Sequence, residues 1–169
     1  MIEFNSPISV YIVNFFMDAV DRKILALLQE DAALSIEKIA AKVHLSSTPC
    51  WKRIRRLEKD GVIQKRVALL DAEKVGAGVT VFVAIKTNQH NREWLDHFAS
   101  SVEDMPEILD FYRMSGEIDY LLRVVVSDIA AFDAFYQRLI SRVPLSDVTS
   151  SFAMEKIKHT TALPITATE

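Results

Sequence analysis

The sequence predicts an α+β protein in which an N-terminal winged helix-turn-helix domain is joined to a C-terminal ferredoxin-like β-α-β-β-α-β domain. Two observations carry this prediction. Three helical patterns separated by short turns precede Gly61, and the third is strongly basic. After Gly78, strand-like and helix-like patterns follow the order of a split βαβ arrangement. We therefore expect an extension at 1–16, the helix-turn-helix domain at 17–70, a linker at 71–78 and the ferredoxin-like domain at 79–169.

Two amphipathic helices are expected before the basic one. Asp18 can cap the first helix, which ends near 29–33, and Ser35 can cap the second and shorter helix. Apolar residues at helical spacing mark their inward faces: Val20, Ile24, Leu27, Leu28, Ile36, Ile39, Ala40 and Val43. Only His44 and Leu45 separate the second helix from the cap of the third. This is the order of a helix-turn-helix motif, whose last helix enters the major groove of DNA.

The third helix, expected at about 47–60, has one apolar and one basic face. Ser46 can cap it through its hydroxyl, Pro49 lies in its first turn, and Gly61 supplies the left-handed stop. Its apolar stripe is formed by Cys50, Ile54 and Leu57. Between residues 42 and 66, eight Lys or Arg stand against two acids. A basic helix face is most often only a solvated surface, but the helix-turn-helix context favours a face that binds the polyanion DNA.

The predicted DNA-binding residues lie along this basic face. Side chains near the helix N-terminus reach the base edges, and the candidates for base contacts are Ser47, Thr48 and Trp51. The candidates for phosphate contacts are Lys52, Arg55 and Lys59. Ser46 and Arg56 complete the predicted set. The following segment, 62–70, is expected to be a short extended wing that carries Lys65 and Arg66.

Several separated motifs resemble those of one family. They read D-R-K-I-L-A-L-L-Q, L-S-S-T-P-C-W-K-R-I-R-R-L-E-K-D-G-V-I, V-A-L-L-D-A-E-K-V-G and S-G-E-I-D-Y-L-L-R-V. In order and spacing they are similar to the Lrp/AsnC family of bacterial transcription factors, the leucine-responsive regulatory protein and asparagine regulator, over about Met17 to Pro164. The segments T-P-C-W-K-R, S-D-V-T-S-S-F-A-M-E and K-H-T-T-A-L-P-I look closest to a branch associated with cysteine detoxification. The resemblance implies a sequence-specific regulator that binds double-stranded DNA, senses a small amino acid and forms homo-oligomers.

The second domain is expected to contain four strands and two helices. The strands are expected at 79–86, 108–114, 120–126 and 148–157. The first helix is expected at 92–102, and Asp128 can cap the second, which Pro144 ends. A sheet packed by two helices leaves its other face bare, which predicts at least a dimer. Whether dimers, tetramers or octamers form is left open.

The candidate effector site is the turn between the second and third strands. Glu117 and Asp119 can pair with an ammonium group, and the free N–H groups of the turn can bind a carboxylate. Taken alone, both carboxylates can equally be solvated turn residues. The resemblance implies a site formed by the turn and the last strand: Gly116, Glu117, Asp119, Tyr120 and Ser150. Glu117 stands where the family usually has Asp, and Val148 replaces a frequent Thr. Cysteine is the favoured effector, followed by a small or branched aliphatic amino acid.

Composition narrows the classes of function. The 169 residues carry a net charge of −3, with twelve Lys or Arg against ten Asp or Glu through residue 75, and eight against thirteen after it. The acidic second half is not expected to touch DNA. The single cysteine, Cys50, excludes an intrachain disulfide, is expected to be a buried hydrophobe and fits a reducing cytoplasm. The four histidines lack paired ligand spacing, so no metal site is expected.

Other functions are weighed against this one. No phosphate-binding loop, nucleophile elbow or cofactor motif is present in the sequence, so neither an enzyme nor a cofactor is expected. The enzymatic alternative would use Glu117 and Asp119 as general acid and base. A nucleoid-organising protein is a second alternative, and genome-wide occupancy would separate it from a local regulator.

The extension at 1–16 is unusually apolar. Its run at 8–16 is too short to span a bilayer and lacks the basic region and cleavage site of a signal peptide, so no membrane contact is expected. We expect either an over-called start before Met17 or a disordered arm, with a strand or helix packed on a dimer as the alternative.

Overall fold

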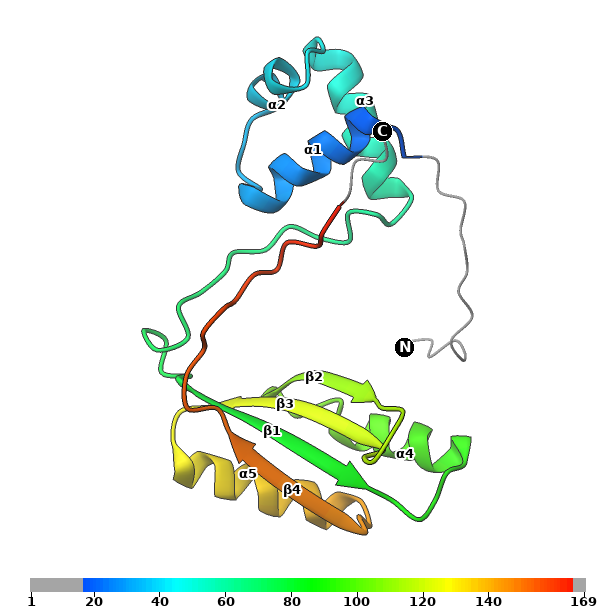
Figure 1. Ribbon diagram of the computed structural model, residues 1–169, viewed down its shortest axis with the longest axis vertical. Helices are drawn as coiled ribbons and strands as arrows, with labels where there is room; N and C mark the ends of the chain where they lie inside the picture. Colours follow the sequence, from blue (N-terminus) through cyan, green and yellow to red (C-terminus); the bar gives the residue numbers. More distant parts are fainter. Residues whose placement is uncertain (1–16, 166–169) are drawn as a thin grey trace. The chain divides into compact units, whose positions relative to one another are not determined.

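The computed structural model describes residues 17–165 and divides into two compact units. Among these residues the first unit contains 17–68 and 159–165, and the second contains 69–158. The chain therefore crosses from one unit to the other twice (Figure 1). The second crossing differs from the expected division, which placed the whole C-terminal segment in the second domain. The expected extension lies outside the described residues.

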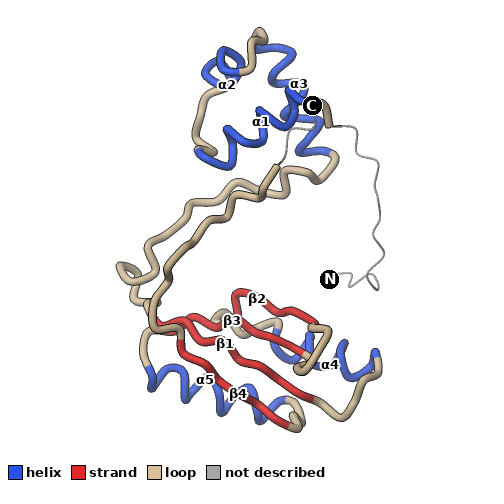
Figure 2. The backbone as a smooth tube through the Cα atoms, in the orientation of Figure 1, coloured by secondary structure: helices blue, strands red, loops and turns tan. Residues whose placement is uncertain are grey.

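Three helices form the first unit (Figure 2): α1 (Ala19–Glu30), α2 (Ile36–Lys42) and α3 (Ser47–Lys59). α1 begins after Asp18, whose carboxylate accepts the Asp21 N–H at 2.8 Å, while the Asp21 carboxylate accepts the Asp18 N–H at 3.2 Å. This reciprocal capping box satisfies two N–H groups at the start of the helix. Ser35 caps α2 by accepting the Lys38 N–H at 3.3 Å. The predicted order of three helices is confirmed.

The tight turn between α2 and α3 depends on His44, which has a φ of 58°. A left-handed φ is uncommon for a residue other than glycine, and here it accompanies a hydrogen bond from the Leu45 N–H to the Ala40 carbonyl at 2.9 Å. Ser46 is the N-cap residue of α3, but its hydroxyl makes no capping hydrogen bond. The predicted hydroxyl cap is therefore wrong: only the Ser46 carbonyl serves the helix, by accepting the Cys50 N–H at 3.3 Å.

One apolar core joins the three helices, and the C-terminal segment contributes to it. The buried residues of this core are Ile24, Leu25, Ile39, Ala40, Val43, Cys50, Ile54 and Leu57. Ile165 packs against the same core. The Gln29 side chain of α1 donates to the Leu163 carbonyl at 3.2 Å and accepts the Leu163 N–H at 2.6 Å. The last described residues are thus docked on α1.

Residues 62–78, between α3 and the first strand, form no strand of their own. The segment expected to be the wing, 62–70, therefore lacks the strand pairing of a wing. The expected linker contains a compact bend, because the Asp71 carboxylate accepts the N–H groups of Glu73 at 3.1 Å and Lys74 at 3.3 Å.

The second unit has the predicted ferredoxin-like order. Its elements are β1 (Val79–Lys86), α4 (Arg92–Val102), β2 (Ile108–Arg113), β3 (Tyr120–Val126), α5 (Ile129–Arg142) and β4 (Asp147–Phe152). The strands form one antiparallel sheet in the order β2-β3-β1-β4. β4 ends earlier than the predicted residue 157. The Ala153 N–H makes the last bond to the sheet, at 2.9 Å to the Thr80 carbonyl, and β1 begins only one residue before Thr80.

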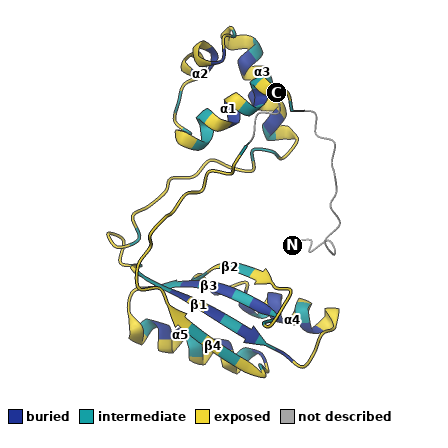
Figure 3. Cartoon of the chain, in the orientation of Figure 1, coloured by how far each residue is buried: buried dark blue, intermediate teal, exposed yellow. Residues whose placement is uncertain are grey.

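Buried residues alternate with more exposed ones along β1 and β3 (Figure 3), so the two faces of the sheet differ in burial. Alternate residues of β1 and β3 pack with α4 and α5 in one core: Val81, Val83, Ile85, Tyr120, Leu122, Val124 and Val126. On the other face, Phe82 lies opposite Arg123 in the strand register and is 39% exposed. Arg123 forms an ion pair there with Asp110 of β2. The sheet thus has one packed face and one partly apolar, solvent-exposed face.

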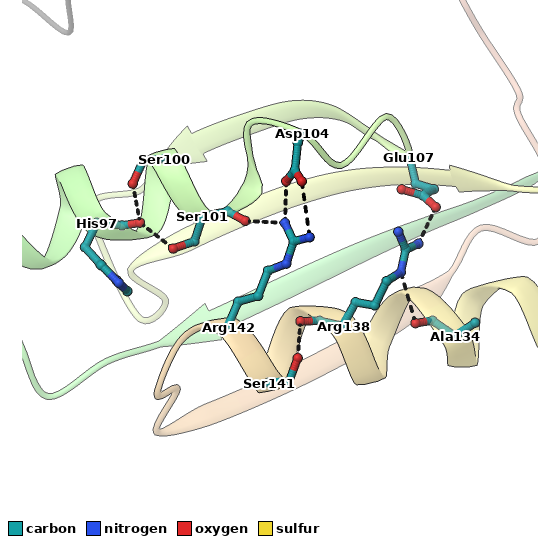
Figure 4. Close-up of polar contacts among 9 residues, drawn as sticks. All are labelled: His97, Ser100, Ser101, Asp104, Glu107, Ala134, Arg138, Ser141 and Arg142. Carbon is teal, nitrogen blue, oxygen red and sulfur yellow. Dashed lines mark hydrogen bonds and ion pairs between the residues drawn. The ribbon is translucent and has the colours of Figure 1, made fainter.

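Two arginines of α5 form ion pairs with acidic residues in the segment between α4 and β2 (Figure 4). The Arg142 guanidinium binds the Asp104 carboxylate and donates to the Ser101 carbonyl at 2.7 Å. Arg138, one turn earlier, pairs with Glu107. The hydrogen bond from Arg142 lowers the pKa of Asp104, although burial opposes the shift. These contacts join α5 to the end of α4 and to the loop that leads into β2.

Candidate nucleic-acid interface and ligand site

All eight residues predicted to bind DNA are exposed, seven of them on α3 and Ser46 at its N-cap position. They are Ser46, Ser47, Thr48, Trp51, Lys52, Arg55, Arg56 and Lys59. The opposite stripe of the helix is buried, as predicted, and burial raises the pKa of the Cys50 thiol there, although the charge of Arg53 opposes the shift. Trp51 is 47% exposed, which is unusual for so large an apolar side chain. The helix is thus anchored by one face and free to contact a ligand by the other.

The cations of this exposed surface are not equivalent. Arg55 lies over the Trp51 ring at 5.7 Å and pairs with Glu58 at 3.1 Å. Glu58 also pairs with Arg66 at 3.1 Å. Such exposed ion pairs contribute little energy, so a phosphate can replace Glu58 as the partner of Arg55. Lys52 has no ion pair within residues 17–165 and is directly available.

Two acidic residues at the start of α1 bind two arginines of α3, a relationship that the sequence analysis missed. Arg53 donates to Asp18 at 2.6 Å and to Asp21 at 2.8 Å, and Arg56 also binds Asp21. The hydrogen bonds that Arg53 donates to both carboxylates, that to Asp21 first, raise the pKa of Arg53. Burial would raise the pKa of Asp18, but the Asp21 N–H and Arg53 outweigh it and lower that pKa. The available signal was the position of Asp21, three residues before the buried Ile24 and on the same helix face.

The predicted effector turn is tightly closed by the backbone. Gly116 has a φ of 140°, and the Met114 N–H donates to the Asp119 carbonyl at 2.8 Å. Glu117 is exposed, whereas Asp119 is partly buried. The Asp119 carboxylate accepts the Thr87 N–H at 2.8 Å, and its other oxygen lies 3.5 Å from His90 Nδ1. The turn therefore offers one free carboxylate and one that already holds the loop after β1.

Tyr120 and Ser150 lie apart from the three turn residues. The Tyr120 ring belongs to the core, 5.3 Å from Trp94 and 5.6 Å from Phe98 between ring centroids. Burial, reinforced by Asp119 and opposed by Arg113, raises its pKa. Ser150 lies on the edge strand β4 opposite Val83. It shares the helix-facing side of β4 with Val148, whereas Thr149 and Ser151 occupy the exposed side. The structure thus brings together Gly116, Glu117 and Asp119 alone.

Residues 17–165 contain neither a cluster of metal-ligating side chains nor a membrane-spanning helix. No group of three or more His, Cys, Asp or Glu is placed there to hold a metal ion. In the same part of the chain, no helix has both the length and the apolar composition needed to cross a membrane.

Known proteins match both units. Residues 17–64 match the family described as winged helix-turn-helix DNA-binding, and residues 80–163 match the Lrp/AsnC ligand binding domain. The DNA-binding transcriptional activator DecR of Escherichia coli is 58% identical over 150 residues, which cover 88% of this chain and 99% of DecR. A crystal structure of an AsnC family transcriptional regulator from Agrobacterium tumefaciens is 59% identical with a TM-score of 0.85, over 88% of this chain and 97% of that one. The transcriptional regulator NMB0573 of Neisseria meningitidis, solved in complex with L-Met, is 37% identical with a TM-score of 0.82, over 88% and 96%.

Proposed function

We propose, given that the chain belongs to the Lrp/AsnC family of DNA-binding transcription regulators, that α3 reads a specific target sequence and that a small amino acid bound by the second unit changes this reading. The family consists of regulators, and the protein is not an enzyme. The observation that carries the proposal is the exposed basic surface of α3, which the buried Cys50, Ile54 and Leu57 hold in place.

The residues of α3 divide by their reach. Ser47, Thr48 and Trp51 lie in the first turns of the helix, where side chains of a recognition helix meet base edges in the major groove. Lys52, Arg55 and Lys59 lie further along and suit phosphate oxygens. Ser46 precedes these two groups, whereas Arg56 is bound to Asp21 and is not proposed as a phosphate contact. Two such helices in a dimer would bind half-sites about one helical turn apart, so the target should be an imperfect palindrome.

The exposed face of the sheet supports assembly into at least a dimer. Phe82 and Tyr112 are 39% and 52% exposed, and Phe82 lies opposite Arg123 in the register, as Tyr112 lies opposite Leu121. Burial of such apolar and aromatic area is the main driving force of association. The second unit is therefore proposed to provide the oligomer contact as well as the ligand site.

The proposed effector is cysteine, with a small or branched aliphatic amino acid next. The resemblance to a branch associated with cysteine detoxification favours cysteine, and the L-Met complex of NMB0573 supports an amino acid in this class of domain. We place the ammonium group of the effector at the turn that contains Gly116, Glu117 and Asp119, because this turn carries two carboxylates. Ser150 is proposed to contribute from β4.

A two-stage experiment tests this function. Thermal unfolding of the full chain with each of the twenty amino acids, cysteine under reductant, should show a raised melting temperature for the true effector, because a ligand of the native state stabilises it. Gel shifts on a duplex selected in vitro from random DNA should then change affinity with that amino acid and not with the others. The absence of any stabilising amino acid would contradict the sensor role, and the failure to enrich any duplex would contradict specific DNA reading.

A further inference from the structure

The arginines that bind Asp18 and Asp21 are held by a buried acid. The Asp21 side chain is only 1% exposed, and its two oxygens accept from Arg53 at 2.8 Å and from Arg56. Asp18 accepts a further hydrogen bond from Arg53 at 2.6 Å. A carboxylate so buried keeps its charge only while it is paired. Both guanidinium groups are therefore held to α1 by the Asp21 carboxylate.

Arg56 would otherwise lie with the cations of the exposed basic surface. At about 100° per residue, its direction on the helix differs by only about 40° from that of Lys52. Its side chain is also 46% exposed, so a short rearrangement would bring its guanidinium to the surface. Lys52 and Lys59, by contrast, have no ion pair in the described part of the chain. Asp21 thus determines which basic side chains of α3 are available to bind a DNA phosphate.

We propose that Asp21 sets the balance between sequence-specific and sequence-independent binding of DNA. It withdraws Arg53 and Arg56 from the phosphate-contacting set, and it fastens α3 to α1 so that the base-reading residues keep a fixed direction. Phosphate contacts strengthen binding to every sequence, whereas base contacts discriminate. The inference rests on the proposed role of α3 as the DNA-contacting helix.

Asp21→Asn in the full chain tests the inference, because the amide is nearly isosteric and uncharged. The equilibrium constant is measured against salt concentration on a random-sequence duplex and on a duplex selected in vitro with the unaltered protein. One or two freed arginines should steepen the logarithmic salt slope on random DNA by roughly 0.9 for each new phosphate contact. The ratio of selected to random affinity should fall. An unchanged or shallower slope on random DNA would overturn the inference, since damage to the fold alone weakens binding without adding phosphate contacts.

Two matched variants of α3 keep the inference testable if Asp21→Asn fails to fold. Arg56→Gln should leave the slope on random DNA unchanged, because that charge is already held by Asp21. Lys52→Gln should make the slope shallower by roughly 0.9. An equal loss from Arg56→Gln would overturn the inference. No change from Lys52→Gln would instead show that α3 is not the helix that contacts DNA, and the proposed function itself would fail.

Discussion

The Asp119 carboxylate accepts the backbone N–H of Thr87 at 2.8 Å, across 32 residues of sequence. Thr87 is buried, and the Asp119 N–H donates in turn to the Ile85 carbonyl at 3.0 Å. Asp119 therefore joins the turn before β3 to the loop after β1. Glu117, in the same turn, is exposed and makes no ion pair within the described residues. The two carboxylates of the predicted effector site thus have different structural roles, because Asp119 holds the loop after β1 and Glu117 does not. Single substitutions can test the two roles separately.

Asp119→Ala should destabilise the second unit by about 1 to 3 kcal/mol, because the buried Thr87 N–H loses its acceptor. Denaturant unfolding monitored by tryptophan fluorescence measures this change, since Trp94 lies in the core of the same unit. Glu117→Ala is the control and should leave the free energy of unfolding within experimental error. Equal stability of the two variants would show that the Thr87 contact contributes nothing.

Asp119→Asn should separate ligand binding from folding. The amide oxygen can still accept the Thr87 N–H, so stability should be kept, but the negative charge that would pair with an ammonium group is lost. Binding of the effector should weaken by about 2 kcal/mol, roughly thirtyfold. Calorimetric titration with cysteine under reductant, and with leucine, alanine, asparagine and methionine, gives the measurement. Affinity equal to that of the unaltered protein would remove the turn from the ligand site.

Substitutions on α3 should divide into two classes. Thr48→Ala and Trp51→Ala should lose mainly the complex with a selected duplex, since a base contact contributes about 1 to 3 kcal/mol of discrimination. Lys52→Ala and Arg55→Ala should weaken binding to selected and random duplexes alike. Gel shifts at one fixed salt concentration compare the four. If none of the four substitutions changes the affinity for DNA, the basic surface of α3 is exposed to solvent but does not bind DNA.

Phe82→Glu should dissociate the proposed oligomer without unfolding the unit. The new carboxylate lies opposite Arg123 in the strand register and can pair with it in the monomer, but it would be costly to bury at an interface. Ile129→Glu is the matched control, because Ile129 is 72% exposed on α5, away from that face. Light scattering should show a smaller species for Phe82→Glu alone. An unchanged mass would place the oligomer contact elsewhere.

Acid should weaken the first unit partly through Asp18. The pKa of Asp18 is lowered in the folded chain, since hydrogen bonds from the Asp21 N–H and Arg53 outweigh the opposing effect of burial. A lowered pKa means that stability is present above the ordinary value of 3.8 and is lost as pH falls through the folded value. Asp18→Asn, which preserves a good N-cap, should flatten this part of the pH dependence. Asp128 lies in the second unit, where a hydrogen bond from the Ala131 N–H lowers the pKa of its carboxyl group. Asp128→Asn should therefore leave the pH dependence of the first unit unaltered.

Local signals in the sequence located the elements well. Asp18, Ser35 and Asp128 cap their helices as predicted, and Gly61 ends α3 with a φ of 75°. These caps and this left-handed stop are set within a few residues, so the sequence predicts them, although the Ser46 hydroxyl at the start of α3 makes no capping hydrogen bond. The length of β4 was overestimated, because a strand needs a partner and the start of β1 at Val79 decides where pairing stops.

The candidate sites were harder to predict because side-chain partners come from elsewhere in the chain. The pairing of Asp21 with Arg53 and Arg56 joins residues more than thirty apart in sequence. The position of Asp21 on the buried face of α1 indicates that this acid needs a partner, but not which residues provide it. Tyr120 is different: it alternates with Leu122 along β3, so strand periodicity alone places its ring in the core. Its place in the effector site came from the resemblance alone and stays a prediction.

The two hydrogen bonds between the Gln29 side chain and the Leu163 backbone hold the C-terminal segment on the first unit. The second unit is therefore an insertion within the first, because the segments before and after it belong to the same unit. A single protease cut between residues 68 and 79 would leave the two pieces associated through the Gln29–Leu163 hydrogen bonds and the packing of Ile165. Release of the N-terminal helices would require a second event, either a cut near 158 or unfolding of the docked segment. A shortened C-terminus would likewise remove side-chain packing from the DNA-binding unit, although the deleted residues belong, by position, to the opposite end of the chain.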